Sequence, residues 1–191
     1  SAASDVYKRQ HLPKEKFTLQ LGNPSLICKN FKLNVVSDFR IKDILNGGQG
    51  APIGSYYHKL LINKINPKSA IINLGGVANF TLINKNKLIS SDIGPANAIT
   101  DDLMFYFFKK NFDRNGNNAS KGIKNIEIFE LYKKNSFFKK TFPKSLDRNN
   151  FHYLFKKLKK LRPHDALNTS SNFTIYSINQ LIEHKIFENI N

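Results

Sequence analysis

Three glycine-containing segments carry most of the residues in this chain that could do chemistry. They are residues 38–40 with 47–52, residues 73–79, and residues 92–97, and we call them the first, second and third corners. Each follows a segment with strand-like patterning. Because open α/β sheets bind ligands beyond the ends of their strands, we take the corners as candidate functional sites.

The first corner combines a carboxylate and a guanidinium, Asp38 and Arg40, with the glycine-rich stretch 47–52. Glycines let the backbone approach a ligand closely, so Gln49 and Gly50 could lie beside one. The alternative is a structural turn with a surface ion pair between Arg40 and Asp43. The residues alone leave both interpretations open.

The second corner contains Gly75-Gly76, which could turn backbone N–H groups toward a phosphate with no Cβ in the way. A tight hairpin is the alternative, and it is favoured when this corner is taken alone. The pattern is neither a Walker loop nor the dinucleotide fingerprint.

In the third corner, Asp92 leaves a strand just before an expected helix. It could be an N-terminal helix cap. It could also be a general base beside phosphate-binding amides, which requires a carboxylate within hydrogen-bond reach of the nucleophile.

Other candidates are weaker. The five histidines lack metal-ligand spacing. At most one of Asp101 and Asp102 would face a site, and Cys28 is expected to be a small buried core residue.

The elements that would position these corners follow from apolar periodicity and turn residues. We expect a strand at 17–21, a short helix at 25–30, a buried strand at 33–37 that delivers Asp38, and a helix at 55–65. After a boundary at residues 66–68 come strands at 70–74, 79–83 and 87–90 and a helix at 96–110. The remainder is helical in pattern, with loops at 113–118 and 141–148 and a final helix starting at Pro163.

The sheet predicted after the boundary is incomplete. Three strands and a helix leave one sheet face and one strand edge uncovered. We infer that the second domain is unfinished here.

The charge of the 191-residue chain, +16, raises the question of nucleic-acid binding. Most of the basic residues are lysines accompanied by many Asn and Ile, a bias that A/T-rich codons also produce, and the five arginines are scattered. The run 156–160 reads as the solvated face of a helix whose inward residues are Phe151, Leu154, Phe155, Leu158 and Leu161. We therefore expect no nucleic-acid partner.

Composition also bears on location. There is one cysteine, no apolar run of membrane-spanning length and no export signal near residue 1, so we expect a cytoplasmic protein without a membrane partner.

Read in order, the corners resemble the anhydro-N-acetylmuramic acid kinase family. The matching segments are residues 18–24, 35–40, 47–52, 73–79, 92–97 and 143–145, in register from about Phe17 to the C-terminus.

The resemblance implies an α/β, actin-like (ribonuclease H-like) sugar-kinase fold, incomplete here, with two domains around a cleft. Residues 1–16 would be an unmatched extension, 17–66 the end of the first domain and 67–191 the start of the second. Family members use ATP and Mg²⁺ to convert 1,6-anhydro-N-acetylmuramic acid and water to N-acetylmuramic acid 6-phosphate in cell-wall recycling.

The resemblance also assigns roles to residues. Asp92 would deprotonate the water, and Gly75, Gly76, Gly94 and Asn97 would bind ATP. Asp38, Arg40, Gln49 and Gly50 would line the sugar pocket. No protein ligand to a metal is expected, and a homodimer is kept as one option for the full-length protein.

Some family features are missing. Neither the Gly-Thr-Ser-x-Asp-Gly phosphate loop nor the later nucleoside-binding glycine motif is present, and Ile93 and Ala96 stand where Thr and Gly are common. Residues 146–149 replace the usual Thr-Gly-Arg-Glu. We therefore expect little or no turnover from this chain alone. Two alternatives stay open: a basic, non-catalytic module that binds RNA or an acidic partner, and a kinase for another anhydro sugar.

Overall fold

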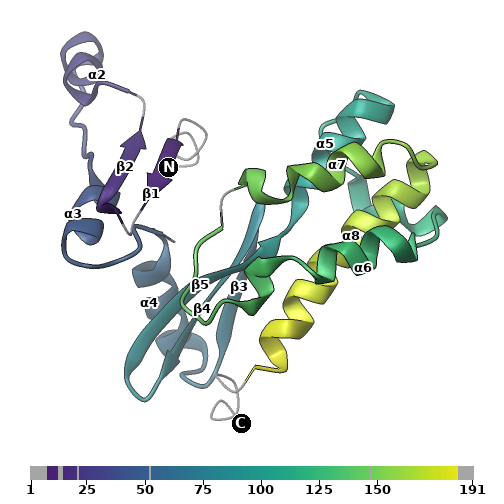
Figure 1. The fold of residues 1–191 in the computed structure, drawn as a ribbon. Coiled ribbons are helices and arrows are strands. Elements are labelled where there is room, and N and C mark those ends of the chain that lie inside the picture. The colour runs from purple at the N-terminus through teal and green to yellow at the C-terminus, as the bar shows by residue number, and fades with distance from the viewer. Residues whose placement is uncertain (1–7, 13–14, 21, 52, 147, 185–191) are drawn as a thin grey trace. The chain divides into compact units, whose positions relative to one another are not determined.

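The computed structural model describes residues 8–12, 15–20, 22–51, 53–146 and 148–184. Contacts between residues divide the chain into two units, Ser1–Ile53 and Gly54–Asn191. Both contain helices and antiparallel strands, so the chain is of mixed α/β class (Figure 1).

The first unit pairs strand β1 (Lys8–Leu12) with β2 (Phe17–Gln20) in an antiparallel hairpin. Helices α2 (Pro24–Phe31) and α3 (Phe39–Leu45) follow. Asn23 caps α2 by accepting a hydrogen bond from the Leu26 N–H, and Pro24 occupies the first turn, where its missing N–H costs nothing. The strand and helix expected from 17 to 30 are confirmed, whereas β1 lies in a segment without useful periodicity.

Two predictions for the first unit are wrong. Residues 33–37 form no strand, and Leu33 and Val36 are 59% and 74% exposed. Neither sheet of the described residues pairs with this segment, so its backbone has no ladder to join. Cys28 is exposed rather than buried, because α2 has no buried residue at all.

The second unit is built on an antiparallel meander of β3 (Ala70–Leu74), β4 (Val77–Asn84) and β5 (Lys87–Pro95), in the order β3-β4-β5. The three predicted strands are confirmed, and the structure extends β4 and β5 by several residues. The register shifts by one residue between Ala78, opposite Gly94, and Asn79, opposite Asp92. Ile93 is therefore a β-bulge residue on β5.

Helix α4 (Ser55–Ile65) covers one face of this sheet, where the His58 ring nitrogen Nδ1 lies 2.9 Å from Thr81 Oγ1 on β4. Side chains alternate along a strand, so Phe80 and Leu82 face the other side and form a cluster with Leu181. Because α4 packs on β4, the contacts place this helix with the second unit. The domain boundary predicted at residues 66–68 stays a prediction.

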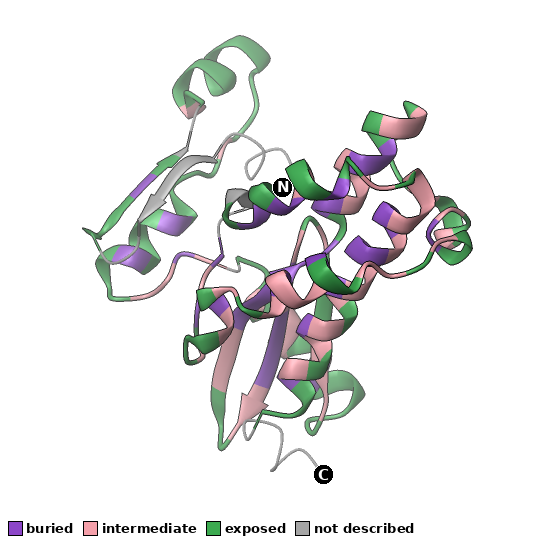
Figure 2. Ribbon diagram, turned by 45° about the vertical axis from the view of Figure 1, so that its right-hand side comes forward, coloured by how far each residue is buried: buried purple, intermediate pink, exposed green. Residues whose placement is uncertain are grey.

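The rest of the second unit is helical: α5 (Asn97–Phe108), η2 (Arg114–Gly116), η3 (Ala119–Lys121), α6 (Ile126–Lys133), η4 (Ser136–Lys139), η5 (Arg148–Phe151), α7 (His152–Leu158) and α8 (Pro163–Ile182). Its larger apolar cluster is centred on Tyr132 and Phe173, and Figure 2 shows how buried residues line the inner sides of these helices.

Two helical predictions are confirmed. The residues expected to point inward from the 151–161 segment are buried or half-buried while Lys156, Lys157, Lys159 and Lys160 are exposed, and α8 starts at Pro163. Among the described helices, none is long and apolar enough to cross a bilayer.

Candidate functional site

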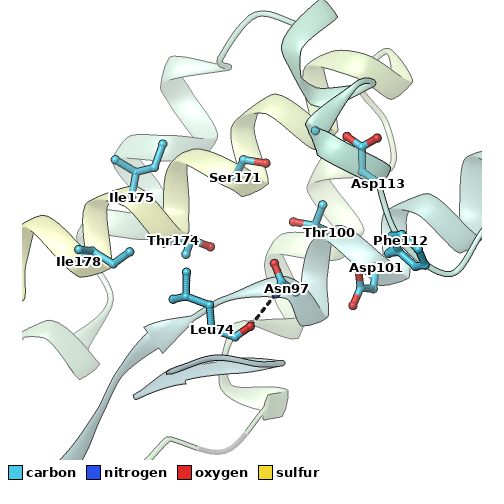
Figure 3. A pocket seen from close by; sticks show the side chains of 11 residues that line it. Leu74, Asn97, Thr100, Asp101, Phe112, Asp113, Ser171, Thr174, Ile175 and Ile178 are labelled. Carbon is cyan, nitrogen blue, oxygen red and sulfur yellow. Dashed lines mark hydrogen bonds between the residues drawn. The ribbon is translucent and has the colours of Figure 1, made fainter. Parts of the chain in front are cut away.

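The second and third corners lie together, at the start of α5. The Asn97 N–H donates to the Gly75 carbonyl at 2.9 Å, and the Ala96 and Ala98 N–H groups donate to the Gly76 carbonyl at 3.1 and 3.2 Å. The Asn97 side chain adds a bond to the Leu74 carbonyl at 2.8 Å (Figure 3). The hairpin turn between β3 and β4 is thus bound to the first turn of α5.

These bonds set the direction of the turn's own donor. A trans peptide holds its C=O and N–H antiparallel, so the Gly75 carbonyl that faces α5 turns the Gly76 N–H away from the helix. The Gly76 N–H therefore takes no part in joining the turn to α5.

Packing within the fold does not explain why Gly75 and Gly76 are glycines. Neither has a positive φ. A Cβ would lie 3.8 Å from its nearest neighbours at Gly75 and 3.5 Å from Ala98 Cβ at Gly76, which are ordinary contacts. The bare backbone leaves room for close approach by another group, as a phosphate-binding turn requires.

Gly94 is different. A Cβ there would overlap the hydroxyl oxygen of Ser177 on α8 and lie 3.2 Å from the Tyr132 hydroxyl. Close packing of α8 on β5 accounts for this glycine, and its predicted contact with ATP stays a prediction.

Asp92 is buried on β5, with 9% of its surface exposed. Its Oδ2 accepts a hydrogen bond from the Leu146 N–H at 2.7 Å, and its own N–H donates to the Lys144 carbonyl at 3.0 Å. Helix α5 starts five residues later with Ala96 at the N-cap and no side-chain cap, so the helix-cap interpretation of Asp92 is wrong. The adjacent bulge at Ile93 is a device that re-aims neighbouring side chains.

A cavity of about 580 Å³ adjoins the turn and α5. Figure 3 shows its lining from β3, α5, the following loop and α8. Asp101 lines it and Asp102 does not, in agreement with the expectation that at most one of the two faces a site. Apolar groups of Leu74, Ile175 and Ile178 lie beside the polar groups of Asn97, Thr100 and Thr174.

The first corner, in the other unit, is a loop closed onto α3. Arg40 is 4% exposed and its Nη1 donates to the Gly50 carbonyl at 2.6 Å, while the Gly50 N–H donates to Asp43 Oδ2 at 2.7 Å. Gly50 has φ +63°, where a Cβ would also press on Ile44. Arg40, Asp43 and Gly50 therefore shape the loop, whereas Asp38 is exposed at the start of α3 and Gln49 is half-buried.

Comparison with known proteins identifies the family. The family profile described as anhydro-N-acetylmuramic acid kinase matches residues 5–189. The chain belongs to this family.

Relatives in the anhydro-N-acetylmuramic acid kinase family include the protein of that name from Rhodopseudomonas palustris (strain ATCC BAA-98 / CGA009), 40% identical over 88% of this chain and 46% of its own length. That of Gamma-proteobacterium EBAC31A08 is 39% identical over 85% and 45%. That of Zymomonas mobilis subsp. mobilis is 38% identical over 74% and 39%. The chain thus spans about half the length of the curated relatives that it matches.

The family match begins at residue 5. It therefore includes most of the segment 1–16, which we expected to be an extension without a match in the family. Periodicity could not reveal β1 because its residues, Lys-Arg-Gln-His-Leu, are almost all polar.

The sequence analysis assigned no role to Ser91 and Lys144, although residues 143–145 are one of the segments that match the family. In the structure both bond to the backbone around Asp92. The only sequence signal for Lys144 is its place between Pro143 and Ser145 in a segment that matches the family. This pattern does not tell whether the lysine is buried or exposed.

Proposed function

We propose that this chain is part of an ATP-dependent kinase that converts 1,6-anhydro-N-acetylmuramic acid and water to N-acetylmuramic acid 6-phosphate in peptidoglycan recycling. The observation that carries the proposal is the bonding of the Gly75-Gly76 turn to Ala96, Asn97 and Ala98, which brings a glycine turn beside the strand of Asp92. Membership of the kinase family supports the same activity.

In the proposed reaction a water oxygen attacks C1 of the sugar while the bond from C1 to the bridging oxygen O6 breaks. O6 takes the γ-phosphoryl group of ATP, and ADP leaves. Asp92 accepts the proton of the attacking water. Its bond from Leu146 N–H holds the carboxylate in one orientation, as positional catalysis requires.

The Gly76 N–H would bind a phosphate of ATP, and Asn97 would hold the turn by its bond to Leu74. Among the described residues no group of three or more His, Cys, Asp or Glu side chains could hold a metal ion. Mg²⁺, when bound with ATP, would be held mainly by phosphate oxygens and water, and it would neutralise charge on the transferred group.

For the sugar, Asp38 and Gln49 are proposed as direct contacts, and Arg40 and Gly50 as residues that shape the loop. We also propose that the full-length protein has the actin-like sugar-kinase fold, with the two units in different domains. A cytoplasmic location fits a substrate released by wall turnover and a reaction that consumes ATP.

The test is a hybrid in which this chain is joined to the flanking segments of the Rhodopseudomonas palustris relative. Asp92→Asn keeps the shape of the side chain but removes its basicity, so kcat should fall by at least ~10²-fold. ADP release in the presence of the anhydro sugar measures it.

Glu130→Gln, on α6, where the half-buried carboxylate pairs with Lys133, is the control for the change from carboxylate to amide and should leave kcat unchanged. Near-normal turnover by the Asp92→Asn hybrid would reject the role of Asp92. A folded, unmodified hybrid that does not phosphorylate the sugar would contradict the proposed activity.

A further inference from the structure

The chain from residue 137 to residue 146, which we call the Lys144 loop, is bonded through its backbone to β5 beside Asp92. The Lys144 N–H donates to Ser91 Oγ at 2.8 Å, and the Ser91 hydroxyl donates to the Lys144 carbonyl at 2.9 Å. The Asp92 N–H also donates to that carbonyl, at 3.0 Å. The backbone N–H and the backbone carbonyl of Lys144 are thus both held by β5.

The Lys144 side chain turns back into its own loop. Its Nζ donates to the carbonyls of Phe137 at 3.2 Å and Lys140 at 3.3 Å. The same nitrogen lies 4.4 Å from the ring centre of Phe137 and 4.5 Å from that of Phe142, within the range of cation–π attraction. One ammonium group therefore connects the start, middle and end of the loop.

This lysine is costly to bury. Only 9% of its surface is exposed. Burial, together with the nearby charge of Lys140, lowers the pKa of Lys144 to about 8. A methionine would fill a similar space between the rings without that cost, so packing alone does not account for a cation here.

We propose that Lys144 is a positioning residue for Asp92: its ammonium group fixes the path of the loop so that the Leu146 N–H reaches Asp92 Oδ2. Three sets of hydrogen bonds connect the Lys144 ammonium group to Asp92. They are the bonds of Nζ to two carbonyls of the loop, those of the Ser91 hydroxyl, and the 2.7 Å bond from the Leu146 N–H to Asp92 Oδ2. The consequence for catalysis rests on the proposed role of Asp92 as base. The effect of Lys144 on the Asp92–Leu146 bond is a structural claim that does not depend on that role.

Amide hydrogen exchange on this chain, at about pH 6.5 where Lys144 is charged, tests that effect. Lys144→Met should speed exchange at the Leu146 and Asp92 amides by at least ~10-fold and leave the buried amides of α8 unchanged. Lys144→Arg keeps a cation that donates to carbonyls and should restore most of the protection. Lys139→Met, at an exposed position of the same loop, is the matched control and should change neither amide.

Unchanged protection of Leu146 in Lys144→Met would overturn the inference. If Lys144→Met does not fold, Lys144→Arg decides: protection of Leu146 like that of the unmodified chain supports the inference, and its loss contradicts it.

In the hybrid enzyme, Lys144→Met should lower kcat by ~10-fold or more while the KM for ATP stays unchanged, because Lys144 does not contact the Gly75-Gly76 turn. A fall in kcat and a rise in KM together would point to general loss of structure and contradict a positioning role. If Asp92→Asn proves fully active but Lys144→Met still frees the Leu146 amide, the proposed role of Asp92 as base fails and the structural connection between Lys144 and the Asp92–Leu146 bond stands.

Discussion

At the scale of single residues, the glycines of the candidate site serve different physical ends. Gly94 is required by a neighbouring helix, since any side chain would overlap Ser177. Gly50 is required by its own backbone, which has φ +63°. Gly75 and Gly76 are required by neither, and we propose that they let a phosphate approach the turn closely.

This distinction predicts that two alanine substitutions in the same unit change the free energy of unfolding by different amounts. Gly94→Ala should lower the free energy of unfolding by ~1–3 kcal/mol, because Ser177 and α8 must shift. Gly76→Ala should change it by less than ~1 kcal/mol, because its Cβ meets only Ala98 at 3.5 Å. Urea unfolding of this chain measures both. Equal destabilisation by the two would show that the turn, too, is constrained by packing.

At the scale of elements, the connection from α5 to α6 is held by one carboxylate. Asp113 accepts bonds from the backbone of Asn118 and Ala119 and from the Asn118 side chain, at 2.8–3.1 Å. Ala119 then accepts from the Asn168 side chain on α8 at 2.9 Å. This loop, expected from its Asn and Gly content, thereby joins the end of α5 to α8. Both helices contribute residues to the larger apolar cluster.

The pKa of Asp113 makes this loop sensitive to acid. Burial by itself raises that pKa, but the bonds from Ala119 and Asn118, together with the charge of His164, outweigh it and hold the pKa below 3.8. The folded value lies below the unfolded one, so ionised Asp113 stabilises the fold above about pH 4 and ceases to do so as the pH falls through the folded pKa.

Asp113→Ala should therefore lower the free energy of unfolding by ~1–3 kcal/mol at neutral pH, and its difference from the unmodified chain should shrink in acid. Urea unfolding at a series of pH values checks this. A difference that stays constant with pH would mean that the loss comes from packing rather than from the ionised carboxylate.

At the scale of the whole molecule, the two clusters of buried apolar residues found among the described residues belong to the second unit. In the first unit, α2 has no buried residue, and Leu26, Phe31 and Leu33 are exposed. The stability of the chain should therefore reside in residues 54–191.

A polypeptide of residues 54–191 should melt cooperatively within a few degrees of the 191-residue chain, by circular dichroism. Residues 1–53 alone should show no cooperative transition, because a small unit with little buried surface is marginal. A 54–191 polypeptide that does not fold would mean that the first unit contributes to its core.

The sequence by itself determined the elements whose patterns are local. Helix 55–65, strand 70–74 and the helix start at Pro163 were predicted to the residue, because side-chain periodicity and a first-turn proline act within the segment. The glycine turns and the family motifs were equally legible. Only the tertiary structure decided what each segment packs against. It joined the turn at residues 75–76 to the start of α5, and it connected Asp92 to Leu146 and Lys144, more than fifty positions away. It also left residues 33–37 without a partner strand and Cys28 exposed, since burial depends on contacts between distant segments that no local pattern encodes.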